Sequence, residues 1–217
     1  MIKTVIFDLD GLIIDSEPIE SESLEILLRR YNKIPIYYET GLIHTVGGGG
    51  AWYDQLRKKY EIEDSVEIIK RKKRRIYLSL LKNKEFEPAK GFYKLIKTLK
   101  KRDIKTALAS NRYKIHIKFI IERIGIRTFF DSVVGPNNKL RHKPAPDMHI
   151  QVAKRFRIRP DECLVLEDSE TGVVAGKAAG MKVIAVPNQY TKNQDLSQAD
   201  LIVNSLEDIR WSTISKL

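Results

Sequence analysis

The sequence has very little cysteine and no long hydrophobic run. Cys163 is the only cysteine among 217 residues, which excludes an intramolecular disulfide and a cysteine-rich metal site. The longest apolar runs, such as 183–187, have the length of a strand and fall far short of the ~20 residues that a membrane span needs. Asp8 and Asp10 interrupt the first apolar stretch where a signal peptide would continue. We therefore expect a soluble cytoplasmic protein with no membrane partner.

The charge is abundant and predominantly positive. Hydrophobic residues make up 42% of the chain and charged residues 31%, which is typical of a globular protein of one or two domains. The formal net charge is +11, and a basic surface attracts phosphate backbones. The one dense basic run, Lys70–Arg75, lies inside a helical pattern, which favours a solvated helix face over a nucleic-acid site. We expect a positive field that favours small anionic substrates and no nucleic-acid partner.

Strand and helix patterns alternate through most of the chain. Hydrophobic patterning predicts strands at 2–7, 104–109, 132–134, 163–166, 182–186 and 201–203, with helices at about 90–101, 113–124, 147–156 and 172–179 between them. Such alternation is typical of right-handed βαβ units and a parallel sheet. The near-continuous apolar strands indicate a sheet covered by helices on both faces. The fold class is therefore α/β, with a Rossmann-like core formed by residues 1–16 and 85–217.

Residues 17–84 form an insertion after the first strand. Apolar residues recur there at helical spacing in three stretches, and no strand pattern interrupts them. Four of the twelve glycines stand together at Gly47–Gly50, which indicates a need for backbone freedom. Trp52 follows this loop and could stack on a sugar or base, or pack inside the helical unit. The insertion is predicted to be an α-helical domain.

Polar residues stand at the strand ends, where the site of a parallel α/β sheet is expected. A buried sheet would not choose these residues for packing. They are Asp8-Leu9-Asp10-Gly11 after the first strand, Ser110-Asn111 after the strand at 104–109, Lys143-Pro144-Ala145-Pro146-Asp147 before the helix at 147, and Glu167-Asp168 after the strand at 163–166.

These segments, together with Ser169 and Thr171-Gly172, resemble the haloacid dehalogenase-like superfamily in its magnesium-dependent phosphatase and beta-phosphoglucomutase branch. A lone Asp-x-Asp is a weak signal, but all four segments in order on the correct strand ends are specific. The resemblance covers the whole chain, because the helical insertion is similar to the family's cap domain. It implies a hydrolase that acts on a small phosphorylated metabolite.

The resemblance implies separate roles for the first two aspartates. Asp8 would be the nucleophile that forms an aspartyl-phosphate, and Asp10 would be the acid/base. In extended backbone, residues i and i+2 point to the same side, so both side chains can face one substrate. Two nearby carboxylates can also hold different protonation states. The alternative is a turn or capping motif before Gly11.

A Mg²⁺ site is implied as well. By resemblance its ligands are the Asp8 carboxylate, the Asp10 backbone carbonyl and the Asp168 carboxylate, with Glu167 less directly involved. Magnesium prefers such oxygen ligands, and clustered carboxylates without a cation would repel each other. The alternative for Glu167 and Asp168, capping of the following helix, is compatible with metal binding.

The remaining site residues would bind phosphate. Lys143 is the expected clamp, a point charge that also offsets Asp8, on a chain held extended by Pro144 and Pro146. Ser110 would donate its hydroxyl to a phosphate oxygen or cap the next helix, and Asn111 would share either role.

Two departures favour a phosphatase over a phosphomutase of the beta-phosphoglucomutase type. Sugar phosphomutases of this family carry a histidine five residues after the cap-entry aspartate, and here Asp15 is followed at that distance by Glu20. They also use a cap-loop arginine, and 47–52 contains none. A non-catalytic phospho-receiver or nucleic-acid-binding protein remains a further alternative. The sequence does not set the physiological substrate or the oligomeric state, for which a monomer is the default expectation.

Overall fold

The computed structural model describes residues 1–34, 50–85 and 87–217. The chain divides into two compact units, one made of Met1–Asp15 with Phe86–Leu217 and the other of Ser16–Glu85. The predicted glycine loop falls outside the described residues, apart from Gly50, with which helix α3 begins.

A single parallel sheet forms the centre of the larger unit. Its strand order is β3-β2-β1-β4-β5-β6, with bounds β1 (Thr4–Phe7), β2 (Lys105–Ala109), β3 (Ser132–Val134), β4 (Cys163–Glu167), β5 (Lys182–Ala185) and β6 (Leu201–Ile202). The central strand β1 pairs in parallel with β2 and β4, so that Phe7 lies opposite Leu108 and Leu166. This sheet confirms the predicted α/β, Rossmann-like class.

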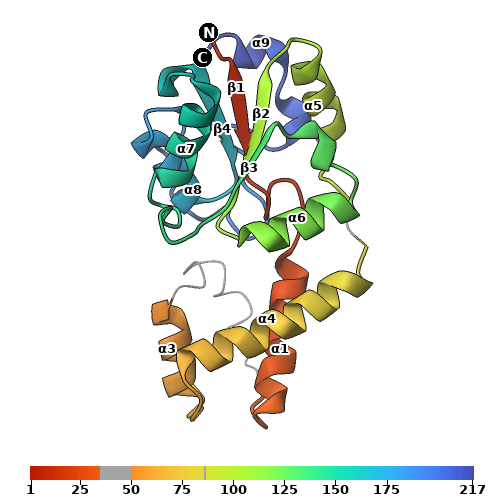
Figure 1. Cartoon of the computed structure of the whole chain (residues 1–217), viewed down its shortest axis with the longest axis vertical. Helices are drawn as coiled ribbons and strands as arrows, with labels where there is room; N and C mark the ends of the chain where they lie inside the picture. Colours follow the sequence, from red (N-terminus) through yellow and green to blue (C-terminus); the bar gives the residue numbers. More distant parts are fainter. Residues whose placement is uncertain (35–49, 86) are drawn as a thin grey trace. The chain divides into compact units, whose positions relative to one another are not determined.

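Helices cover both faces of the sheet. They are α5 (Phe92–Lys100), α6 (Lys114–Arg123), α7 (Asp147–Phe156) and α8 (Glu170–Ala178), with the short α9 (Trp211–Ile214) near the C-terminus. The chain moves from β1 to β2 and β3, then returns across β1 to β4 and β5. Right-handed crossovers therefore place α5 and α6 on one face and α7 and α8 on the other. Figure 1 shows α7 and α8 on the opposite side of the sheet from α5.

Alternate residues of β1 enter two separate apolar layers. Ile6 packs with Val165, Val183 and the buried residues of α7 and α8. Phe7 points the other way, and its ring meets that of Phe92 on α5 edge-on with centroids 6.0 Å apart. Because both faces of the strand are buried, a continuous apolar run is required here rather than alternation of apolar and polar residues.

The smaller unit is helical, as α1 (Glu17–Arg30), α3 (Gly50–Lys59) and α4 (Val66–Asn83). Trp52 is only 6% exposed and lies edge-on against Tyr53 in the core of this unit, so it is a packed aromatic residue and not an open stacking platform.

The basic run lies on α4, where Lys73 is buried against Glu20 while Arg71, the neighbouring Lys72, and Arg74–Arg75 are exposed. In the described part of the chain, no helix combines the length and hydropathy that a bilayer crossing requires.

The aromatic contact between β1 and α5 yields a test of the core. Phe92 is fully buried, whereas the adjacent Tyr93 is 43% exposed. We expect Phe92→Ala to lower the free energy of unfolding by about 3–5 kcal/mol, since it leaves a cavity beneath the central strand. Urea denaturation would measure the loss. Tyr93→Ala is the matched control and should cost several-fold less; equal losses would contradict this account of the core.

Candidate active site

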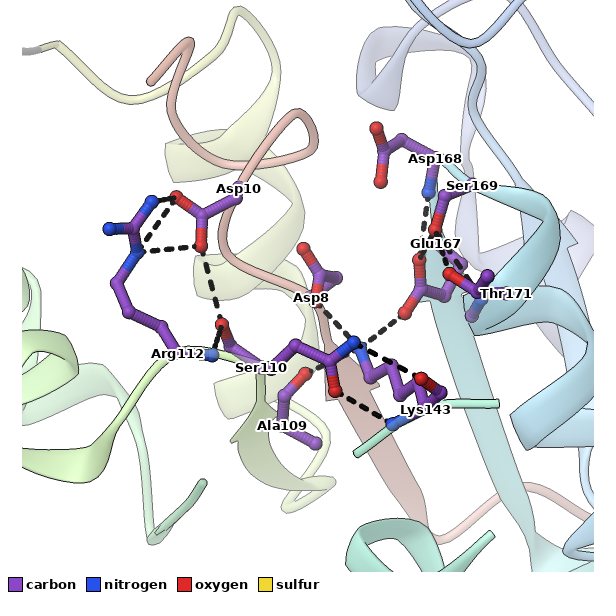
Figure 2. A network of polar contacts seen from close by, with 12 residues as sticks. Asp8, Asp10, Ala109, Ser110, Arg112, Lys143, Glu167, Asp168, Ser169 and Thr171 are labelled. Carbon is purple, nitrogen blue, oxygen red and sulfur yellow. Dashed lines mark hydrogen bonds and ion pairs between the residues drawn. The ribbon is translucent and has the colours of Figure 1, made fainter. Parts of the chain in front are cut away.

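Polar side chains of the candidate site gather at the carboxyl edge of the sheet (Figure 2). Asp8 follows β1, Ser110 follows β2, and Asp168 follows Glu167, the last residue of β4. Lys143 reaches the same place from the loop between β3 and α7. Because β1 pairs in parallel with β2 and β4, these three strand ends share one edge. The structure thus brings together the four predicted strand-end segments.

Lys143 is the centre of the network. Its Nζ donates to Asp8 Oδ1 at 2.6 Å, to the Ala109 carbonyl at 2.7 Å, and to a carboxylate oxygen of Glu167. An ammonium has three protons, and here each has an acceptor from a different strand end. The side chain is 3% exposed, so its charge depends on these partners rather than on water.

The environment keeps Lys143 protonated. Burial by itself would lower the pKa of its ammonium, but the carboxylates of Asp8 and Glu167 outweigh burial and raise that pKa above its ordinary value. A fixed positive charge therefore lies beside Asp8 at every physiological pH. Such a charge can hold an anionic group against the end of β1.

Asn111 holds the backbone of Lys143. Its Oδ1 accepts from the Lys143 backbone N–H at 2.7 Å, and its Nδ2 donates to the Lys143 carbonyl at 3.3 Å. The amide thus fixes the loop that carries the ammonium. The structure does not place Ser110 or Asn111 at a helix N-cap, because Tyr113 occupies that position before α6.

The carboxylates of Asp8, Glu167 and Asp168 form a buried cluster, with one oxygen of each within 4.8 Å of the others. Glu167 is already engaged, since one oxygen accepts from Lys143 and the other from the Asp168 backbone N–H and the Ser169 hydroxyl, both at 3.2 Å. Among the described residues, Asp8 Oδ2 receives no hydrogen bond. Asp8 and Asp168 are therefore better placed than Glu167 to ligate an ion directly.

Two of these acids resist ionisation. Burial, together with the charges of Glu167 and Asp10, raises the pKa of Asp8 to about 7, although Lys143 opposes the shift. Burial and then the charges of Glu167 and Asp8 raise the pKa of Asp168 well above its ordinary value. The single positive charge of Lys143 does not neutralise the three carboxylates of this cluster. The donor set fits a hard divalent cation such as Mg²⁺, which takes carboxylate oxygens and would favour the ionised forms.

Close packing around the cluster depends on two glycines. Gly11 has φ +84°, and a Cβ there would lie 2.2 Å from Asp168 Oδ2. A Cβ on Gly172 would lie 1.9 Å from the carboxyl carbon of Glu167. Asn188 completes the junction, because its Nδ2 donates to the Gly11 carbonyl at 3.0 Å and to Asp168 Oδ2 at 2.9 Å. The amide thereby orients the Asp168 carboxylate.

Asp10 faces a different set of partners. The Arg112 guanidinium binds both of its oxygens, with Nη2 2.7 Å from Oδ1 and Nε 2.9 Å from Oδ2. The Ser110 hydroxyl donates to Oδ2 at 3.3 Å. Strand β1 ends at Phe7, and Asp10 lies beyond it, in an isolated β-bridge to Ile14. Its role as acid/base and its carbonyl's role as a metal ligand stay predictions.

Sequence reasoning missed Arg112 and Asn188. Asn188 stands in the loop after β5, where the strand-end rule could have found it. Arg112 stands two residues after Ser110, but only the fold reveals that it pairs with a carboxylate about one hundred positions earlier. Beyond the presence of the acids, no sequence pattern predicts that the pKa values of Asp8 and Asp168 are raised.

Comparisons with known proteins show the family to which the chain belongs. A family model described as haloacid dehalogenase-like hydrolase matches residues 5–186. A Drosophila melanogaster relative named "probable pseudouridine-5'-phosphatase" is 30% identical over 94% of this chain and 90% of its own. The bifunctional riboflavin kinase/FMN phosphatase of Arabidopsis thaliana is 43% identical over 55% of this chain, which spans about a third (32%) of that protein. The crystal structure of beta-phosphoglucomutase from Clostridium difficile has a TM-score of 0.82 at 24% identity, covering 100% of this chain and 96% of that one.

The raised pKa of Asp8 predicts how metal binding depends on pH. Without metal, the folded protein holds a proton on Asp8 up to about pH 7, whereas in the unfolded chain the pKa is near 3.8. Between these values each rise in pH therefore favours unfolding of the metal-free protein. Mg²⁺ competes with that proton and removes this penalty. We expect the increase in melting temperature caused by Mg²⁺ to grow from about pH 5.5 to about pH 8.

Thermal melts in EDTA and in Mg²⁺ across this range would measure the effect. Asp8→Asn is the control, because it removes one of the two titrating carboxylates and should weaken the dependence. A Mg²⁺-induced shift that is equal at every pH, or one that Asp8→Asn leaves unchanged, would contradict the assignment of Asp8 to the metal site.

Proposed function

The chain belongs to the haloacid dehalogenase-like hydrolases, and from that premise we propose that it is a Mg²⁺-dependent phosphatase acting on a small phosphate monoester through an aspartyl-phosphate on Asp8. The coarser activity, phosphoryl transfer as a phosphoric monoester hydrolase, follows from the family and its phosphatase relatives. The metal, the intermediate and the class of substrate, a sugar phosphate or similar metabolite, are the finer part of the proposal.

One observation carries the proposal: Asp8 presents one oxygen to the Lys143 ammonium and keeps the other without a donor among the described residues. A carboxylate held in this way is oriented and still has lone pairs for attack. The positive charge of the same ammonium lies where it attracts a phosphate that approaches Asp8. Mg²⁺, held by Asp8 and Asp168, would neutralise negative charge on the transferring phosphoryl group.

In the first step, a carboxylate oxygen of Asp8 attacks phosphorus. The bond from phosphorus to the ester oxygen breaks, and the departing oxygen takes a proton from the Asp10 carboxylic acid. Lys143 stays protonated and holds the charge that the phosphoryl oxygens carry. The products of this step are the free alcohol and the Asp8 phosphate.

In the second step, water attacks the same phosphorus. The Asp10 carboxylate, left ionised by the first step, takes a proton from the water as the bond between phosphorus and the Asp8 oxygen breaks. Inorganic phosphate leaves, and Asp8 is again a carboxylate. Ser110 supplies a hydroxyl beside Asp10 for a phosphate oxygen.

The smaller unit supports hydrolysis over mutase chemistry. Glu20 occupies the place of the mutase histidine, and its carboxylate pairs with the buried Lys73. An anionic side chain committed to an ion pair cannot replace an imidazole as proton carrier. Water is then the acceptor of the phosphoryl group.

Substitution of the two aspartates should separate their roles. We expect Asp8→Asn to abolish labelling of the protein by a phosphoryl donor, because an amide oxygen is a poor nucleophile. Asp10→Asn should still form the intermediate but turn over about 10²–10⁴-fold more slowly, since general acid–base help is lost. Rapid-quench labelling with acetyl phosphate would measure both. Asp161→Asn, an exposed carboxylate before β4, is the matched control; labelling of Asp8→Asn on another residue would refute the assignment.

Metal removal tests the second part of the proposal. We expect excess EDTA to stop hydrolysis of an aryl phosphate and excess Mg²⁺ to restore it, because the Asp8 and Asp168 carboxylates otherwise repel a phosphate dianion. A panel of sugar, nucleotide and glycerol phosphates, each with Mg²⁺, would then rank the substrate classes by kcat/KM. Full activity in EDTA would overturn the metal dependence.

A further inference from the structure

Arg112 and Asp10 form an ion pair near the candidate nucleophile. Nη2 and Nε of the guanidinium each donate to a different oxygen of Asp10, at 2.7 and 2.9 Å, which is a bidentate arrangement. The side chains are 12% and 23% exposed, so the pair is largely withdrawn from water. The Arg112 backbone N–H also donates to Ser110 Oγ at 3.1 Å, and Ser110 donates to Asp10 at 3.3 Å. The three residues thus form a ring of hydrogen bonds (Figure 2).

We propose that Arg112 is a positioning residue that fixes the orientation of the Asp10 carboxylate for proton transfer. The inference rests on the proposed function and concerns the ionised Asp10 that takes a proton from water in the second step, because a guanidinium that donates to both oxygens favours the carboxylate form. Such a support is useful because Asp10 lies beyond the end of β1, in a single β-bridge to Ile14 that is followed directly by Gly11 at φ +84°. A planar fork sets both the position and the plane of a carboxylate, which a lysine cannot do.

The segment after β2 serves both functional groups. Asn111 holds the backbone of Lys143 through two hydrogen bonds, while Ser110 and Arg112 hold Asp10. Three consecutive residues therefore align the ammonium and the acid/base relative to the end of one buried strand.

A double-mutant cycle separates positioning from direct phosphate binding. Arg112→Met keeps the apolar stem and removes the fork. We expect it to lower kcat by about 10- to 10²-fold on p-nitrophenyl phosphate, because small misplacement of a catalytic group has costs of this order, and to leave KM within about twofold. In an Asp10→Asn background, the same substitution should add less than about a twofold further loss. Arg112→Lys should restore little, because an ammonium lacks the fork.

Arg159→Met is the matched control. Arg159 makes a similar bidentate pair with Asp161, at 2.9 and 3.0 Å, before the opposite end of β4, and its loss should leave kcat unchanged. A raised KM with kcat intact would mean that Arg112 binds the substrate phosphate, and would overturn the proposal. The proposal would also be overturned if the losses of kcat from Arg112→Met and Asp10→Asn multiplied in the double variant.

A second measurement needs no activity. In protein labelled with ¹⁵N-arginine, the Arg112 Nε–H should give a resolved, slowly exchanging signal, assigned by its loss in Arg112→Lys. Asp10→Asn should shift that signal and speed its exchange. An Nε–H that Asp10→Asn leaves unaffected would overturn the positioning role. Wild-type protein with this signal but without phosphatase activity would instead reject the proposed function, so the two failures are distinguishable.

Discussion

One buried ammonium holds the candidate site together. The three protons of Lys143 go to acceptors at the ends of β1, β2 and β4, and a charge buried without such partners costs several kcal/mol. The three strand ends must therefore stay in register around it. Asn111 adds a backbone clamp on the loop that carries the lysine. Strand pairing positions the three acceptors, and a slip between strands would separate the ammonium from them. Folding of the sheet therefore also assembles the site.

The crowding of acids around this charge sets a second constraint, which is space. Glycine in a helix interior ordinarily costs about 1 kcal/mol relative to alanine. Helix α8 accepts this cost at Gly172 because a Cβ there would overlap the Glu167 carboxylate. A Cβ on Gly11 would likewise overlap the Asp168 carboxylate, and Gly11 also adopts a positive φ. Both glycines lie where a carboxylate approaches the backbone, and their lack of a side chain makes room for the acidic cluster.

Much of the fold was predictable because it depends on local patterns. Apolar runs located the strands to within two residues, and Asp147–Phe156 matches its predicted helix. Helix α8 begins earlier than expected because Ser169 accepts from the Gly172 N–H and caps it. That Asp8 and Asp10 face one substrate stays a prediction, while the structure adds that the Asp10 carboxylate binds Arg112. Contacts such as Arg112 with Asp10 depend on long-range closure of the chain, for which sequence spacing carries no signal.

The charges of the site form one balance. The carboxylates of Asp8, Glu167 and Asp168 crowd around Lys143, and the Asp10 carboxylate pairs with Arg112. In the absence of metal, burial and the neighbouring carboxylates raise the pKa of Asp8 to about 7. A divalent cation at these oxygens would add two positive charges and favour the ionised carboxylates. Metal and protons would therefore compete for one set of oxygens, so that a bound cation would keep Asp8 ionised at lower pH than in its absence.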